Sequence, residues 1–178
     1  MVDLTWVGEK KNKLRRAGTH LARVFRRHPR IIVSMTSYPA RINTVHFAIR
    51  TLLAQKRLPD KIILWLCESD FPNREDDLPE SLKDVLWHDV EVRWVNNDLK
   101  PHKKYYWALQ EFKDDYVITT DDDLLYRNTM IGDLMEMHER HPKAIVAVRT
   151  HLIMFDEQVH ALRTSSGFTK LPIIIQIL

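Results

Sequence analysis

The feature that most constrains the fold is a short apolar run that ends in three consecutive aspartates. Residues 116–120 (Tyr-Val-Ile-Thr-Thr) are β-branched and aromatic, and Asp121, Asp122 and Asp123 follow at once. Such a run predicts a buried strand. Open parallel sheets place their ligand crevice at the carboxyl ends of their strands, and a divalent cation that also binds phosphate oxygens is a common partner for carboxylates there. A solvated acidic turn is the other interpretation.

The rest of the chain alternates predicted strands with predicted helices. Compact apolar runs predict strands, and segments with helical spacing predict helices between them. The second apolar run is almost uninterrupted, which indicates burial on both faces, as in a parallel sheet. The alternation predicts an α/β fold, a Rossmann-like and mostly parallel sheet with helices on both faces. The expected strands are residues 31–36, 61–67, 90–95, 116–120 and 144–149, and the expected helices are residues 45–53, 78–86, 101–112 and 129–141.

The sequence predicts burial for four side chains in these elements. In the helix 101–112, Tyr106, Leu109 and Phe112 are expected to face inward. Cys67 ends an apolar strand, so it is expected to be a small buried hydrophobe rather than a nucleophile.

Length and composition favour one domain with a sizeable core. The chain has 178 residues, of which 44% are hydrophobic and 29% are charged. We expect the α/β domain at residues 31–163, a basic arm at residues 1–30 and an atypical tail at residues 164–178. The tail finishes in the apolar residues 171–178 without a turn or a charge, so the chain is expected to stop where a longer protein would continue.

The net charge of +3 is unevenly distributed. Residues 1–30 hold nine Lys and Arg against two acidic residues, a net charge of +7, so the remainder carries −4. Within the arm, residues 10–30 combine apolar residues at helical spacing with many arginines, which predicts a basic amphipathic helix that ends at Pro29. Such a helix contacts an anionic membrane surface or docks its apolar face on the domain, and both interpretations stay open. Nucleic acid is not expected, because no aromatic-rich binding surface or recognition motif accompanies the arm.

Targeting signals are sparse. No apolar run approaches the roughly 20 residues that cross a bilayer, and the first residues lack the layout of a secretory signal. Cys67 is the single cysteine, so no internal disulfide can form, which fits a reducing compartment. The expected location is the cytoplasm, at the inner face of the membrane if the arm contacts it.

Polar and charged residues gather at the predicted carboxyl ends of three strands. A helix amino terminus with free N–H groups and neighbouring lysines suits anions. An acidic cluster beside basic groups suits a metal-bound diphosphate, in which cation, phosphates and lysines neutralise one another. These residues are Thr36, Ser37, Tyr38 and Arg41 after the first strand, Asp98, Lys100, Lys103 and Lys104 after the third, and the three aspartates after the fourth.

Four short motifs in this order resemble bacterial glycosyltransferases of the GT-A fold. They are residues 36–41 (Thr-Ser-Tyr-Pro-Ala-Arg), 58–61 (Leu-Pro-Asp-Lys), 98–104 (Asp-Leu-Lys-Pro-His-Lys-Lys) and 120–123 (Thr-Asp-Asp-Asp), and the resemblance runs from about residue 31 to residue 162. It implies transfer of a sugar from a nucleotide-diphosphate sugar, UDP-linked by expectation, to a saccharide or another hydroxyl acceptor. It also implies dependence on Mn²⁺ or Mg²⁺.

The resemblance assigns roles to individual residues. It implies that Asp123 is the direct metal ligand and that Asp121 lies toward the ribose or the metal. It further implies that Thr36, Tyr38 and Arg41 line the nucleotide pocket of the donor site and that Asp98 contacts the base. Lys103 or Lys104 would contact the diphosphate, and Asp121 and Asp122 would belong to the same donor site. Simpler interpretations stay open: a surface ion pair for Arg41, a loop-shaping role for Tyr38, a helix cap for Asp98 and solvated first-turn positions for the lysines.

The general base of the reaction has no candidate in the sequence. In similar proteins it belongs to an acidic motif before an aromatic residue, well downstream of the acidic run. Only 55 residues follow Asp123, and Asp156 and Glu157 form the one acidic pair among them. The catalytic base is therefore unassigned, and sugar transfer is expected to be slow or absent.

Two alternatives accompany this hypothesis. The first is a non-catalytic module that binds a nucleotide sugar. The second is another metal-dependent phosphate-handling enzyme. A haloacid-dehalogenase-type phosphatase would need Thr or Val at the position of Leu125, and a nucleotidyltransferase would need a glycine-rich loop where residues 36–41 contain no glycine.

Overall fold

A computed structural model describes residues 29–87, 89–148 and 175–176 of the chain. The chain divides into two compact units, Met1–Asn128 and Thr129–Leu178. The first unit contains β1 (Ile31–Thr36), α2 (Val45–Leu53), β2 (Lys61–Cys67), α3 (Glu80–Lys83), β3 (Val90–Val95), α4 (Lys103–Glu111) and β4 (Tyr116–Thr119), with short 3-10 helices at Glu68–Asp70, Arg74–Asp77 and Lys100–His102. The second contains α5 (Met130–Arg140), β5 (Ala144–Ile145) and β6 (Ile175–Gln176).

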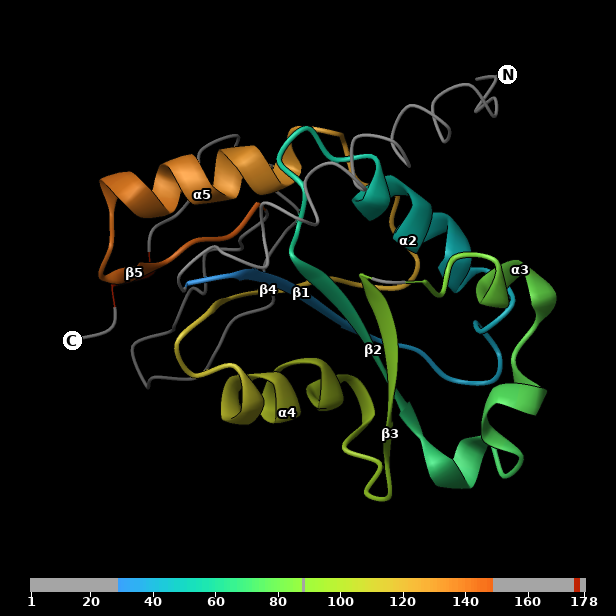
Figure 1. Cartoon of the computed structure of the whole chain (residues 1–178). Coiled ribbons are helices and arrows are strands. Elements are labelled where there is room, and N and C mark those ends of the chain that lie inside the picture. The colour runs from blue at the N-terminus through green and yellow to red at the C-terminus, as the bar shows by residue number, and fades with distance from the viewer. Residues whose placement is uncertain (1–28, 88, 149–174, 177–178) are drawn as a thin grey trace, which may run out of the picture. The chain divides into compact units, whose positions relative to one another are not determined.

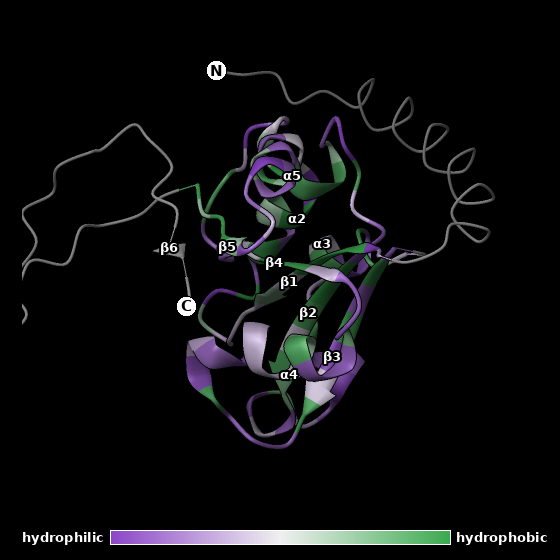
Figure 2. Ribbon diagram, turned by 90° about the vertical axis from the view of Figure 1, so that its left-hand side faces the viewer, coloured by the Kyte–Doolittle hydropathy of each residue, from purple (hydrophilic) through white to green (hydrophobic). Residues whose placement is uncertain are grey.

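The first unit is built around a four-stranded sheet in the order β3-β2-β1-β4 (Figure 1). All three pairings are parallel, with Val33 opposite Ile62 of β2 and Ile118 of β4. The prediction of an α/β, Rossmann-like and mostly parallel sheet is confirmed. Six of the seven residues of β2 are buried, as its uninterrupted apolar run predicts. The strand ribbons of β1 and β2 are correspondingly hydrophobic in Figure 2.

Helices lie on both faces of this sheet (Figure 1). Helix α4 contacts β1, β2 and β4 on one face, whereas α2 and α3 lie on the other and contact each other. Helix α2 buries Val45, Ala48, Ile49 and Leu52, which is the spacing of one helix face. Successive strand residues point to opposite faces of the sheet. Alternate side chains of the same strands therefore pack against the two helix layers.

The face of α4 that packs on the sheet differs from the predicted one. Phe112 is buried as expected, but Tyr106 and Leu109 are 46% and 57% exposed, so their predicted inward position is wrong. The core cluster on this side instead includes Ala108 and Phe112, with Trp107 packed against it. A small residue at the contact lets the helix approach the strands closely, and that requirement outweighs the larger apolar side chains beside it.

Strand β4 is less buried than its composition indicates. Its residues are half-buried or exposed, whereas a buried strand was predicted. Among the described residues β4 pairs only with β1, so it forms an edge of the four-stranded sheet. An edge strand lacks a neighbour on one side, and its side chains keep partial exposure.

The second unit confirms one predicted element and corrects another. Helix α5 lies within the predicted segment 129–141. Of the predicted strand 144–149, the structure describes residues 144–148, and only Ala144–Ile145 forms a strand there. It pairs antiparallel with Ile175–Gln176, so the prediction that it extends a parallel sheet is wrong.

The arm predicted at residues 1–30 lies outside the described residues except for Pro29 and Arg30. The tail predicted at residues 164–178 lies outside them except for Ile175 and Gln176. Within the described part of the chain, no helix has the length and apolar character that a membrane crossing needs.

Candidate functional site

A charged cleft of about 490 Å³ opens at the carboxyl end of the parallel sheet. The loops that follow all four strands contribute to it. The sequence predicts this convergence for the loops after β1, β3 and β4. Its lining consists mostly of polar and charged side chains: Thr36, Ser37, Tyr38, Pro39, Arg41, Asp70, Asp98, Lys100, Pro101, Lys103, Lys104, Thr120, Asp121 and Asp122.

The strand order explains why the cleft lies there. From β1 the chain continues to β2 and β3 on one side, while β4 joins β1 on its other side. Helices α2 and α4, which follow β1 and precede β4, lie on opposite faces of the sheet. The loops after β1 and β4 therefore diverge from a topological switch point, where open α/β sheets bind their ligands.

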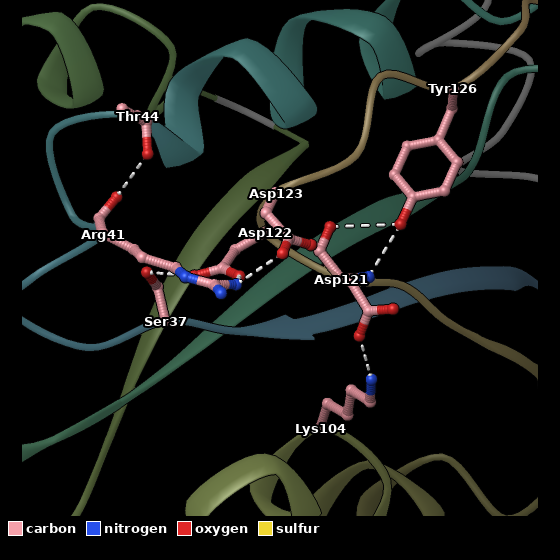
Figure 3. Close-up of polar contacts among 8 residues, drawn as sticks. All are labelled: Ser37, Arg41, Thr44, Lys104, Asp121, Asp122, Asp123 and Tyr126. Carbon is pink, nitrogen blue, oxygen red and sulfur yellow. Dashed lines mark hydrogen bonds and ion pairs between the residues drawn. The ribbon is translucent and has the colours of Figure 1, made fainter.

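Asp121 and Asp122 of the acidic run line this cleft, and all three of its carboxylates pair with side chains of other elements (Figure 3). Asp121 accepts a hydrogen bond from Lys104 Nζ. Asp122 accepts hydrogen bonds from Ser37 Oγ at 2.7 Å and Arg41 Nη1 at 3.0 Å. Asp123 accepts a hydrogen bond from the same Arg41 nitrogen at 2.7 Å. Two carboxylates thus contact the loop after β1, and one contacts the start of α4.

Burial separates the three aspartates. The side chain of Asp122 is 8% exposed, whereas those of Asp121 and Asp123 are 55% and 48% exposed. The buried carboxylate is held by a hydroxyl and a guanidinium of the protein. The two exposed carboxylates present oxygens to solvent, which makes them the accessible pair of the run.

The basic side of the cleft is built on Asp98. Its carboxylate accepts hydrogen bonds from Lys103 Nζ and Lys100 Nζ, both at 2.6 Å, and from the backbone N–H of Lys100 at 3.1 Å. The hydrogen bonds from Lys100 and Lys103 hold the pKa of Asp98 well below its usual range. Lys103 is 3% exposed although it lines the cleft, so its ammonium depends on Asp98 for charge neutralisation.

A serine in strand β1 fixes the start of α4. Ser34 is fully buried, accepts a hydrogen bond from Trp65 Nε1 at 2.8 Å and donates one to the carbonyl of Lys104. This relay joins β2, β1 and α4, and it sets the position from which Lys103 and Lys104 reach the cleft. The sequence signal was a serine inside the apolar run 31–35.

Tyr38 and Thr36 occupy the remaining wall. Arg41 lies over the Tyr38 ring, with 5.6 Å from the guanidinium carbon to the ring centroid, and Tyr38 is 46% exposed. Thr36 Oγ1 donates a hydrogen bond to the carbonyl of Trp65 at 2.8 Å. Tyr38 thus offers an accessible aromatic face, while the hydroxyl proton of Thr36 is already engaged.

The structure gathers nearly all of the predicted site residues. Eight of them line the cleft, namely Thr36, Tyr38, Arg41, Asp98, Lys103, Lys104, Asp121 and Asp122. Asp123 is not among the lining residues and joins the site through Arg41. Two residues of the site were not predicted from the sequence. Asp70, in the loop after β2, lines the cleft, and Tyr126 contacts Asp121; neither belongs to a motif recognisable in the sequence.

A second group of potential metal ligands lies beside the cleft. One ligand atom each from Cys67, Asp70 and Asp98 lies within 4.8 Å of the others, and among the described residues the acidic run does not form such a group. Two lysines already occupy the carboxylate of Asp98. A thiol is also a poor ligand for Mn²⁺ or Mg²⁺, which take oxygen donors. The hard oxygens of Asp121 and Asp123 fit such a cation better.

Fold and site together define a GT-A type α/β protein with a charged cleft at the carboxyl edge of its parallel sheet. The particular family follows from the sequence as a whole. The family model described as "Glycosyl transferase family 2" matches residues 31–175, and the chain belongs to that family. The resemblance to GT-A glycosyltransferases is thereby confirmed at the level of the family.

Other comparisons add little. No curated protein matches the chain. Among solved structures, it is similar to the crystal structure of 4-diphosphocytidyl-2C-methyl-D-erythritolsynthase from Anaerococcus prevotii DSM 20548, with 18% sequence identity and a TM-score of 0.47 over 82% of this chain and 68% of that chain. A similarity of this extent carries no inference about function.

Proposed function

We propose that this chain transfers a sugar from a nucleotide-diphosphate sugar, UDP-linked, to a hydroxyl group of a saccharide acceptor. The observation that carries the proposal is the cleft at the switch point, in which Arg41 and Lys104 each lie beside a carboxylate of the acidic run. A diphosphate needs cations, and a metal that bridges it needs carboxylates. Membership of glycosyl transferase family 2 supports the same reaction.

In this proposal the donor diphosphate lies between Lys104 and Arg41. Arg41 pairs with the half-exposed Asp123 and Lys104 with the half-exposed Asp121, and pairs with exposed carboxylates contribute little to stability. The diphosphate can therefore replace these two carboxylates at small cost, while Arg41 keeps its pair with the buried Asp122. The nucleoside would lie along Thr36 and Tyr38, whose accessible ring offers a stacking surface, and Asp98 would meet the base.

Asp121 and Asp123 are the proposed ligands of Mn²⁺ or Mg²⁺. Their exposed carboxylate oxygens have the donor chemistry that these ions take. When bound, the cation would neutralise the negative charge that develops on the leaving diphosphate. Asp122 faces Ser37 and Arg41, so it would act on the donor by holding Arg41 in place.

The reaction itself breaks the bond between the anomeric carbon and a diphosphate oxygen. A bond from that carbon to the acceptor oxygen forms, the acceptor proton passes to a base, and the nucleoside diphosphate leaves. Lys104 and Arg41 would stabilise the leaving oxygens by charge-assisted hydrogen bonds. The cleft would orient the sugar toward the acceptor, which is the larger part of what such a site supplies.

Titration calorimetry with UDP tests the donor site. We expect UDP to bind in the presence of Mn²⁺ and the affinity to fall about tenfold or more in EDTA, because the carboxylates would otherwise repel the diphosphate. Equal affinity with and without EDTA would contradict the metal role. Absence of any UDP binding under both conditions would overturn the proposed donor.

A matched pair of lysine variants separates phosphate contacts from general charge effects. Lys104→Gln should weaken UDP binding about fivefold to tenfold and leave uridine binding unchanged, because it removes one charge-assisted hydrogen bond. Lys83→Gln is the control, because Lys83 pairs with the exposed Glu80 on α3 and does not line the cleft. Equal losses for UDP and uridine in Lys104→Gln would exclude the phosphate contact.

Turnover distinguishes the transferase from a binding module. The same preparation is incubated with a labelled UDP-sugar, Mn²⁺ and oligosaccharide acceptors, and UDP release is followed. Sugar transfer supports the proposal. Tight donor binding with neither transfer nor hydrolysis would identify a non-catalytic module.

A further inference from the structure

The loop that carries the acidic run is closed by a tyrosine hydroxyl (Figure 3). Tyr126 Oη accepts a hydrogen bond from the backbone N–H of Asp121 at 2.7 Å and donates one to the backbone carbonyl of Asp121 at 3.1 Å. Both backbone polar groups of one residue are therefore held by one side chain five positions later. Among the described residues, Tyr126 is the side chain that hydrogen-bonds the backbone of Asp121.

Helix α2 anchors the segment from which this tyrosine projects. The backbone N–H of Tyr126 donates to Thr51 Oγ1 at 3.1 Å. The carbonyl of Arg127 accepts a hydrogen bond from Gln55 Nε2 at 2.8 Å, and the carbonyl of Asn128 accepts one from the backbone N–H of Lys56 at 2.7 Å. Three consecutive residues are thus fastened to the end of α2 and the turn after it.

Apolar packing does not fix the loop between these anchors. Leu124 and Leu125 are 48% and 70% exposed, so they bury little surface that could hold the chain. At its start the loop is held by the hydrogen bond from Thr120 N–H to the carbonyl of Ser34 at 2.9 Å. Between that bond and α2, polar contacts of Asp121, Asp122 and Tyr126 define the path of the backbone.

We propose that Tyr126 is a positioning residue of this site, which directs the Asp121 carboxylate into the cleft by holding the Asp121 backbone against α2. The Asp121 side chain then reaches Lys104 at the start of α4, on the opposite face of the sheet from α2. Tyr126 acts through Asp121 and does not line the cleft. The ligand of the Asp121 carboxylate rests on the proposed function. The hydrogen bonds between Tyr126 and the Asp121 backbone do not depend on it.

The test uses Tyr126→Phe, which removes the hydroxyl and keeps the ring. Two readouts are needed: amide hydrogen exchange of Asp121 in the ligand-free protein, and UDP affinity with Mn²⁺ by calorimetry. Exchange at Asp121 should accelerate about tenfold, and UDP affinity should fall about tenfold, since each lost hydrogen bond changes an equilibrium constant by several fold. Exchange in β1, at Val33, should stay unchanged, because a general loss of stability would accelerate it too.

Tyr105→Phe is the matched control. The Tyr105 hydroxyl bonds His102 Nδ1 at 2.6 Å and lies outside the cleft lining, so this variant loses a hydroxyl contact elsewhere in the same unit. Its Asp121 exchange and its UDP affinity should equal those of the wild type. If Tyr126→Phe does not fold, Thr51→Val replaces it: this change frees the backbone N–H of Tyr126 and should lower UDP affinity about threefold.

The outcomes separate this inference from the proposed function. Unchanged Asp121 exchange in Tyr126→Phe would show that the hydroxyl does not hold the backbone and would overturn the inference. Faster exchange with unchanged UDP affinity would also overturn it, because Asp121 would then be held for no binding purpose. Faster exchange in a protein whose wild type binds no UDP would overturn the proposed function and leave the anchor of Asp121 intact.

Discussion

The two ends of the parallel sheet contain the same kinds of charged residue and use them differently. At the amino end, Asp115 accepts four hydrogen bonds from Arg30, one from its backbone N–H at 2.8 Å and three from its guanidinium at 2.6 to 3.2 Å. The Asp115 side chain is 2% exposed. At the carboxyl end, the half-exposed Asp121 and Asp123 each pair with one cation, Lys104 of α4 and Arg41 of the loop after β1.

The difference shows what makes a charged cluster available to a ligand. Arg30 chelates Asp115 in a two-point arrangement, and the amino end closes on itself. Asp121 and Asp123 have single, exposed pairs, which are weak and exchangeable. Asp98 is intermediate, because it lines the cleft but neutralises the buried ammonium of Lys103. Burial of the carboxylate, more than the presence of an ion pair, separates a structural carboxylate from one that can bind a ligand: Asp115 is 2% exposed, whereas Asp121 and Asp123 are 55% and 48% exposed.

The largest expected effect is on stability at the amino end. Asp115→Ala should lower the free energy of unfolding by about 3 kcal/mol, because it leaves the half-buried Arg30 without its partner. Asp123→Ala should change the same quantity by less than about 0.5 kcal/mol, as expected for an exposed pair. Urea denaturation of both variants measures the difference. Equal losses would remove the distinction between the two ends.

The next largest expected effect is on UDP affinity, to which the carboxyl end of the sheet should contribute and the amino end should not. Asp121→Asn and Asp123→Asn should each weaken Mn²⁺-dependent UDP binding about tenfold or more, because each removes the charge of a proposed metal ligand. Asp115→Ala, assayed where it is folded, should bind UDP like the wild type. Glu80→Gln serves as a charge control, since Glu80 is 84% exposed on α3. Wild-type affinity in both cleft variants would remove the acidic run from the site.

The sequence was sufficient to predict the sheet and the edge at which the site lies. Strand runs with β-branched residues and the position of three aspartates after a strand carry that information locally. The strand order β3-β2-β1-β4 depends on pairings between distant segments, and no local pattern encodes it. The convergence of the loops could be predicted, because parallel strands present their carboxyl ends to one edge whatever their order.

Individual partners could not be predicted in the same way. The motifs assigned the diphosphate to Lys103 or Lys104 without deciding between them, and the structure turns the two side chains to different carboxylates, Asp98 and Asp121. Adjacent residues on a helix point about 100° apart, so only one of the two can face the acidic run. Tyr126 escaped notice because its role lies in a hydroxyl bond to the Asp121 backbone, which leaves no pattern in the sequence.

The smallest expected effect concerns acid stability and tests the intermediate position of Asp98. Its pKa lies well below the ordinary value of about 3.9, so its stabilising pairs are intact above about pH 4. That stabilisation is lost progressively as the pH falls from about 4 toward the lowered pKa, because the unfolded state takes up the proton first and the folded state only near its own pKa. The difference in unfolding free energy between the wild type and Asp98→Asn should therefore be constant from pH 7 to pH 5 and should narrow below about pH 4. Lys100→Ala removes the first cause of the low pKa, so in that background the narrowing should start at the same pH, which the unfolded state sets, but should be complete at a higher pH. A difference that stays constant down to pH 2 in urea denaturation series would show that Asp98 is not held ionised by its lysines.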